Sequence, residues 1–297
     1  MSWEEKFERW SLGPGKTEAE KCRNAETMIC GALNDDETLS EMDIEVFTQG
    51  SYKARTNISS ESDVDICILN KDFHFSFYPD GFDMSTLSKG ETTYTFYKFK
   101  DEVEAALVRK FGKSGITRGN KAFEVHENSY RWYADVVPAF RFRRYTGRYD
   151  SNRVPYYYEG IRFLSDKGDV ITNYPEQTYK EGVAKHERTN RIYKKIVRIL
   201  KNLRTDMQGN DIAAAKDMAS FLIESLVWNV PDNLFSGYSF EVDTNVVLDY
   251  IAENISNDEL CDEWTEVNDT KYLFRSTQPW TRTKAYNFIL AARKYIN

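Results

Sequence analysis

The chain has 297 residues, of which 41% are hydrophobic and 14% aromatic, enough for one large bilobed unit or two domains. It carries 40 Lys and Arg against 47 Asp and Glu, a net charge of −7. This balance argues against a protein that coats DNA or RNA, because neutralising many phosphates needs a basic face. It does not exclude a small polyanion such as a nucleotide, which a metal ion can accompany.

The sequence predicts neither a membrane span nor a disulfide scaffold. No stretch approaches 18 uninterrupted apolar residues, and the first residues lack the apolar core of a signal peptide. The four cysteines show neither CxxC nor a His-x-Cys cluster. We therefore expect a cytoplasmic protein without structural zinc.

The first half of the chain mixes helical and strand patterns. A capping-box pattern at 17–20 opens a helix whose apolar residues recur at helical spacing as far as Leu33. Strands are expected at Ile44–Phe47, Ser62–Leu69, Ala122–His126 and Arg131–Ala139, and a helix from Phe96 to a stop at Gly112.

Beyond about residue 165 the patterns become helical. They cover 192–203, 218–230 and 246–255, and a last one opens at Pro279. We therefore expect an α+β fold with a mixed twisted sheet and helices over 1–165, including the N-terminal helix, and a helical bundle lobe over 166–297. The cleft between two such lobes is the expected ligand site.

The turn after the strand at 44–47 has features of an anion site. Gly50 lets backbone N–H groups approach a phosphate closely, and Ser51 adds a hydroxyl donor. A lone Gly-Ser is typical of ordinary turns, so this dipeptide predicts little by itself.

Three aspartates strengthen the prediction. Asp63 and Asp65 lie on one face of a strand, with Cα atoms roughly 6–7 Å apart by strand rise. Asp135 lies between apolar residues of another strand, where a carboxylate needs a partner or a metal. A lone Asp-x-Asp is more often a solvated sheet edge, but three carboxylates suit a two-metal site for Mg²⁺.

These motifs resemble a known family. Gly50-Ser51, followed after eleven residues by Asp63-x-Asp65 and later by Asp135, resembles the polymerase-β-like nucleotidyltransferases. The stretches 49–58 and 62–66 are similar to the bacterial cyclic GMP–AMP synthase-like enzymes (CD-NTases) of anti-phage CBASS signalling. The likeness to clade E of that family extends over most of the chain, at 8–11, 135–138, 173–175, 179–204 and 229–232.

The resemblance implies an enzyme that condenses ribonucleoside triphosphates into a cyclic dinucleotide and releases pyrophosphate. It implies two Mg²⁺ ions, replaceable by Mn²⁺, and UTP or ATP, or both, as substrates. A separate effector protein would read the product. The zinc insertion of the animal DNA sensor is absent, so activation by double-stranded DNA is not expected. The implied site residues are Asp63, Asp65 and Asp135 as catalytic metal ligands, and Gln49, Gly50, Ser51, Asn173, Lys201, Ser220 and Phe221 as nucleotide-binding residues.

Several of these residues also have ordinary structural explanations. Lys201 could be a solvated lysine on the polar side of its helix, Ser220 an N-cap, and Asn173 part of an Asx-type turn before Pro175. A solvated face is the expectation for Lys53, Lys194 and Arg198.

If Asn173 acts on substrate, its amide can pair with uracil, which favours cyclic UMP–AMP or cyclic di-UMP. Two other function classes stay open. One is a nucleotidyltransferase acting on RNA ends, an antibiotic or a protein, and the other is a catalytically silent nucleotide-binding protein.

Overall fold

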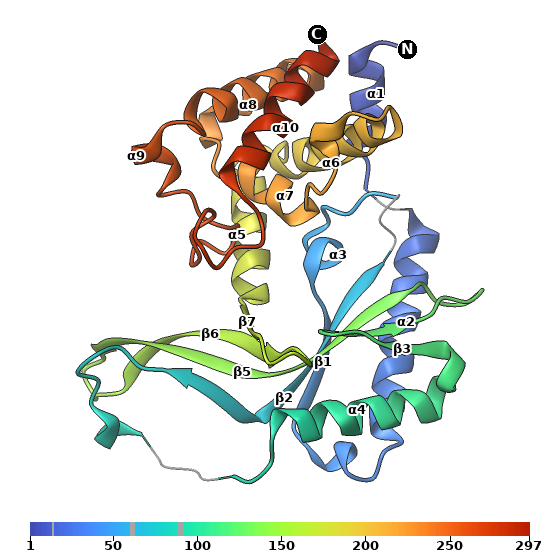
Figure 1. Cartoon of the computed structure of the whole chain (residues 1–297), viewed down its shortest axis with the longest axis vertical. Helices are drawn as coiled ribbons and strands as arrows, with labels where there is room; N and C mark the ends of the chain where they lie inside the picture. Colours follow the sequence, from blue (N-terminus) through green and yellow to red (C-terminus); the bar gives the residue numbers. More distant parts are fainter. Residues whose placement is uncertain (14, 60–62, 88–91) are drawn as a thin grey trace. The chain divides into compact units, whose positions relative to one another are not determined.

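The computed structural model describes residues 1–13, 15–59, 63–87 and 92–297, which form two compact units (Figure 1). The two units are described separately below. The first, called the sheet unit, comprises Lys16–Gly50 and Asp63–Pro175. The second, called the helical unit, comprises Met1–Gly15, Ser51–Ser62 and Glu176–Asn297.

A single sheet dominates the sheet unit. In the described residues it has seven strands in the order β1-β2-β5-β4-β3, with β6 paired to β5 and β7 paired to β6. The strands are β1 Ile44–Thr48, β2 Val64–Phe77, β3 Ile116–Arg118, β4 Phe123–Val125, β5 Ala134–Tyr149, β6 Pro155–Leu164 and β7 Val170–Asn173.

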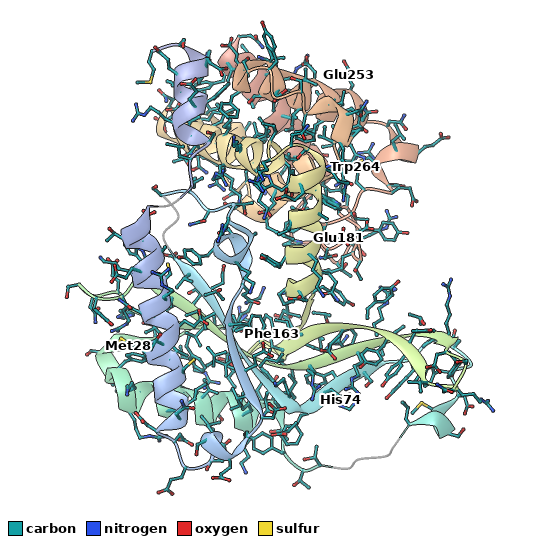
Figure 2. The ribbon with its side chains drawn as sticks, turned by 180° about the vertical axis from the view of Figure 1, so that it is seen from behind. Met28, His74, Phe163, Glu181, Glu253 and Trp264 are labelled. Carbon is teal, nitrogen blue, oxygen red and sulfur yellow. The ribbon has the colours of Figure 1, made fainter. Side chains whose placement is uncertain are left out.

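The two central strands are longer than the sequence predicts. β2 continues past Leu69 and runs parallel to β5 over most of its length. A register shift between Asn70 and His74 breaks the two-residue periodicity, so the pattern hides the second half of the strand. Figure 2 labels His74 in this second half and Phe163 on β6. Ser62, the expected first residue of this strand, lies outside the described residues.

Two long helices cover the sheet. α2, Lys16–Asn34, packs over β1, and α4, Phe96–Phe111, packs over β5 and against α2 (Figure 1). α4 ends at Gly112 with a φ of 78°, as predicted. α2 begins one residue before Thr17, so Thr17 lies inside the first turn rather than at the cap. Short 3₁₀ turns are η1 Leu39–Glu41, η2 Met84–Thr86 and η3 Lys113–Gly115.

The helical unit contains helices from three stretches of the chain. They are α1 Trp3–Trp10, α3 Gly50–Ala54, α5 Pro175–Arg188, α6 Tyr193–Gly209, α7 Ser220–Trp228, α8 Phe240–Asn254, α9 Asp258–Cys261 and α10 Arg282–Ile296, with 3₁₀ turns η4 Ala213–Ala215 and η5 Asp232–Leu234. α3 begins at Gly50, the last residue of the first sheet-unit stretch, and α5 begins at Pro175, the last residue of the second. The last helix begins three residues after Pro279, where the Thr281 hydroxyl accepts the backbone N–H of Lys284.

The core of the helical unit explains why this division differs from a single boundary at 165/166. Phe7 of α1 is fully buried in that core, together with residues of α6, α7, α8 and α10. Trp264, labelled in Figure 2, is buried in the same core. Apolar burial therefore assigns the short first helix α1 to the helical unit, whereas the long helix α2 that follows it belongs to the sheet unit.

The architecture is the expected α+β fold, with a mixed sheet, covering helices and a C-terminal helical part. In the described residues, no helix is both long enough and apolar enough to cross a membrane.

Candidate active site

The turn between β1 and α3 requires a glycine. Gly50 has a φ of 63°, and a Cβ atom there would lie 2.1 Å from Oδ2 of Asp65. The backbone N–H of Gln49 donates to the carbonyl of Asp65 over 2.8 Å. The turn is therefore fixed against the strand that carries Asp65, and any side chain at residue 50 would displace that carboxylate.

Carboxylates form a row across three neighbouring strands. The register pairs Asp65 of β2 with Asp135 of β5, and Asp135 with Glu124 of β4. Paired residues point to the same face, about 4.8 Å apart from strand to strand. Asp63 lies two residues before Asp65, just ahead of β2, and is exposed. Three of these four acids were predicted, and Glu124 is an addition.

The acids of this row influence one another. Burial raises the pKa of the Asp135 carboxyl, and the negative charges of Asp63 and Glu124 raise it further. Tyr133, two residues before Asp135, makes a hydrogen bond to Glu124, and burial together with that contact raises the pKa of its phenol. Like charges held this close favour a bound cation that neutralises them.

The donor chemistry of the row suits a hard divalent cation. Within the ranges that the structure describes, no group of three or more His, Cys, Asp or Glu side chains is gathered closely enough to hold an ion. The donors beside Gly50 are nevertheless all carboxylate oxygens, which Mg²⁺ prefers, and their mutual repulsion is what a cation relieves. The residues therefore fit such an ion by their donor chemistry. The nucleotidyltransferases that the sequence resembles generally depend on a divalent metal.

In the helical unit, Lys201 lies in a buried polar network. Its side chain is 1% exposed, and its Nζ atom lies 3.3 Å from Oε2 of Glu224 and 3.4 Å from the hydroxyl of Thr56. The Thr56 hydroxyl donates to the same carboxylate oxygen over 2.6 Å. The solvated-lysine alternative is therefore wrong, and the role of Lys201 in binding nucleotide stays a prediction.

Ser220 and Phe221 open α7. Ser220 is the first residue of the helix and Ala219 is the N-cap, so the N-cap alternative is wrong. The Ser220 hydroxyl accepts a hydrogen bond from Arg204 over 2.9 Å. The half-buried Phe221 ring lies 6.3 Å from the ring of Trp280 at 56°, which leaves part of an aromatic surface open for stacking.

Asn173 is the last residue of β7 and is half-buried. A Cβ atom at Gly160 of β6 would lie 2.6 Å from the backbone oxygen of Asn173 and 2.8 Å from Tyr174. Glycine at 160 therefore lets the chain around Asn173 pack closely on β6. Among the described residues the Asn173 amide has no hydrogen-bond partner, so it forms no Asx turn there.

The predicted residues are divided between the two units. Glu124 and Glu224 are the residues that the sequence analysis missed. Glu124 alternates with the buried Phe123 and Val125, and this pattern predicts that it faces away from the core. No local sequence pattern near Glu224 predicts its contact with Lys201. The sheet unit holds Gln49, Gly50, Asp63, Asp65, Asp135 and Asn173, and the helical unit holds Ser51, Lys201, Ser220 and Phe221.

A mixed sheet with a carboxylate row beside a glycine turn, followed by a helical part, is the arrangement expected of a nucleotidyltransferase. Comparison with known proteins agrees, because residues 180–297 match the cGAS/DncV-like nucleotidyltransferase C-terminal helical domain. A cyclic dipyrimidine nucleotide synthase CdnE from Legionella pneumophila is 41% identical over 100% of this chain and 98% of its own length.

Two solved structures are also similar over nearly their whole length. The Rhodothermus marinus CdnE c-UMP-AMP synthase with Apcpp and Upnpp has a TM-score of 0.83 and 29% identity, over 98% of this chain and 95% of that one. The Elizabethkingia meningoseptica CdnE cyclic dinucleotide synthase with GTP and Apcpp has a TM-score of 0.80 and 34% identity, over 99% and 98%. The chain therefore belongs to the CD-NTase family of cyclic nucleotide synthases, among the CdnE enzymes, which confirms the resemblance seen in its sequence.

Proposed function

We propose that this enzyme joins two ribonucleoside triphosphates into a cyclic dinucleotide, that it depends on Mg²⁺, and that UTP is one of its substrates. The observation that supports this most is the carboxylate row of Asp65, Asp135 and Glu124 beside the Gly50 turn. The product is then an antiviral signal that a separate effector protein reads.

Each residue has an assigned task in the proposed reaction. Asp63, Asp65 and Asp135 would hold the divalent ions, with Asp135 nearest the attacking 3′-hydroxyl. When bound, the ions lower the pKa of that hydroxyl and neutralise the pyrophosphate that leaves. The Gly50 turn and the Ser51 hydroxyl bind terminal phosphates. The linear intermediate must turn round and bind again, so the same residues serve both bonds.

Base choice is assigned to Asn173. Its amide offers one acceptor and two donors, which match N3–H and O4 of uracil. Among the described residues that amide makes no internal hydrogen bond, so pairing with a base sacrifices none. The Legionella relative is named a cyclic dipyrimidine nucleotide synthase and the Rhodothermus relative a c-UMP-AMP synthase, which supports pyrimidine use here.

The test of the reaction is incubation with all four ribonucleoside triphosphates and Mg²⁺ or Mn²⁺, followed by mass spectrometry of phosphatase-resistant products. Asp65→Asn is expected to lower product formation by about 10³-fold or more, because the amide keeps the shape but not the charge. Asp72→Asn on the same strand is the matched control, since its side chain is exposed and accepts the backbone N–H of Asp43. Full turnover by folded Asp65→Asn would refute the metal assignment.

The test of base choice is Asn173→Ser. The shorter side chain reaches less far and offers a single hydroxyl, so incorporation should move from UTP toward purine nucleotides in the same four-nucleotide assay. A wild-type enzyme that ignores UTP, or a variant with unchanged base preference, would contradict this assignment while leaving cyclic nucleotide synthesis intact.

A further inference from the structure

The helical unit contains a group of cations that the motif analysis leaves without a role. Lys53 follows the Gly50-Ser51 turn, and its Nζ atom lies 5.1 Å from the centre of the Tyr179 ring. Lys194 on α6 approaches the same ring, with Nζ at 5.9 Å. Tyr179 lies on α5, close in sequence to Glu181, which Figure 2 labels. Two lysines from segments far apart in the sequence therefore share one aromatic ring.

Lys194 is buried without an anion. Its residue is only 5% exposed, yet among the described residues its ammonium contacts no carboxylate and no hydrogen-bond acceptor. Burial lowers the pKa of this ammonium most, the negative charge of Glu224 opposes that shift, and the charges of Arg55 and Arg198 each lower the pKa by less. That carboxylate is already bound by Lys201 and Thr56. The expectation of a solvated face at Lys194 is therefore wrong.

Arg198 adds a second buried charge of the same sign. It is 9% exposed and donates to the backbone carbonyls of Ser11, at 2.7 Å, and Arg55, at 2.6 Å. Carbonyls bind the guanidinium but do not neutralise it. Burial lowers the pKa of Arg198 to about 10, which still leaves it charged at neutral pH. Arg55 itself has a φ of 56° and an exposed side chain.

Nearby acids do not balance this group. Glu187, which attracts Lys194, is 3.4 Å from Arg191. In the described part of the chain, the side chains of Lys53 and Arg55 contact no carboxylate. A chain with a net charge of −7 thus concentrates positive charge at one place, where it attracts anions.

The geometry points to a binding site for condensed phosphate, built by Lys194 and Lys53 beside Tyr179 and strengthened by Arg55 and Arg198. The largely buried Lys194 supplies a point charge that is already partly desolvated, and the exposed Lys53 closes on the ligand. This inference rests on the proposed function, because the phosphate chemistry is that of the nucleoside triphosphate tail or of the pyrophosphate that leaves.

The test is titration calorimetry of inorganic tripolyphosphate into the full chain, in EDTA so that no metal contributes. Lys194→Met keeps the length of the side chain and removes its charge, and we expect affinity to fall about tenfold or more. Lys53→Met, an exposed position where folding is not at risk, should also weaken binding. The control is Lys195→Met, because that lysine lies 5.5 Å from the ring of Phe240 instead, and it should bind like the wild type.

A second readout separates binding from a purely structural role. Lys194→Met should unfold at the same or a higher temperature than the wild type when phosphate is absent, because it removes a buried charge that makes no ion pair among the described residues. A lysine that merely held α5 to α6 through Tyr179 would instead destabilise the protein when replaced. Unchanged tripolyphosphate affinity in both Lys194→Met and Lys53→Met would overturn the inference.

Competition identifies the source of the phosphate. Displacement of tripolyphosphate by UTP assigns the site to the substrate tail, and displacement by pyrophosphate but not by UTP assigns it to the leaving product. The product assay is independent of this one. If the wild type makes no cyclic nucleotide while the Lys194→Met variant loses tripolyphosphate binding, the proposed function is contradicted and this site is supported. If the wild type makes a cyclic nucleotide while Lys194→Met and Lys53→Met bind tripolyphosphate unchanged, the proposed function is supported and this site is contradicted.

Discussion

Removing the charge of Lys201 should destabilise the helical unit strongly. Lys201→Met leaves Glu224, whose side chain is 3% exposed, with only the Thr56 hydroxyl as a donor in this network. Breaking a buried ion pair on one side costs about 3–5 kcal/mol, because a charge then stays buried without compensation. Removing both charges, with Lys201→Met and Glu224→Gln together, keeps an oxygen acceptor for Thr56 and should recover most of that loss.

The assay is urea unfolding followed by tryptophan fluorescence, with a thermal scan beside it. In a domain of this size, each kcal/mol of lost stability lowers the melting temperature by about 2–4 °C, so Lys201→Met should lower it by about 6–20 °C. The matched control is the exposed pair of Lys180 and Glu176 on α5, which has the same 3.3 Å separation. Lys180→Met should cost about 0.5 kcal/mol or less, since solvent screens that pair.

The outcome also tests the nucleotide role of Lys201. A variant with wild-type stability but a raised KM for triphosphate would refute this reasoning, because the ammonium would then serve the ligand rather than Glu224. A double variant as unstable as Lys201→Met alone would show that the lost charge is not the cause.

Three further results are expected. Gly50→Ala should abolish turnover and lower stability modestly, as measured by the product assay and urea unfolding, because its Cβ collides with the carboxylate of Asp65 and its φ is positive. In EDTA, Asp135→Asn should raise the free energy of unfolding by relieving repulsion, and added Mg²⁺ should stabilise the wild type more than the variant. Burial, and next the charge of Lys194, lowers the pKa of His186 to about 4 from its ordinary 6.5, so the unfolded chain takes up a proton first as pH falls. Stability should therefore decrease between pH 6.5 and 4, by up to about 1.4 kcal/mol per pH unit from this group, and His186→Asn should flatten that slope in urea unfolding; an unchanged slope would contradict it.

Local patterns in the sequence predicted the part of the site that lies on regular strands. Alternation predicts that Asp63 and Asp65 share one face, with Asp63 lying just ahead of β2, and the apolar neighbours of Asp135 single it out. Local patterns could not predict that Asp65 pairs with Asp135, because this pairing depends on the register between two strands far apart in the chain. Glu124 joins the row for the same reason, through β4.

The helical unit was harder to predict because its polar contacts are long-range. The helical pattern places Lys201 on a polar side and predicts exposure to solvent. In the structure its ammonium is buried against Glu224 and Thr56, which lie 23 and 145 residues away. The assignment of α1 to this unit likewise rests on Phe7, whose contacts are with helices after residue 190. A sequence pattern records local periodicity and not the partner that covers a face.

The division of the chain separates two chemical tasks. The Gly50-Ser51 and Asp63-x-Asp65 motif is divided between the units: Gly50, Asp63 and Asp65 belong to the sheet unit, and the segment Ser51–Ser62 belongs to the helical unit. Thr56 connects that segment to α7, since its hydroxyl donates to Glu224, and its backbone N–H donates within the segment to the carbonyl of Ser51 over 2.9 Å. The residues proposed to bind phosphate from Ser51 onward, including Lys53 and Lys194, therefore share the helical unit, whereas the Gly50 turn and the carboxylates proposed to hold metal belong to the sheet unit. Substitutions in the helical unit should consequently change nucleotide affinity without changing the Mg²⁺ concentration that half-saturates the enzyme, and substitutions in the carboxylate row should do the reverse.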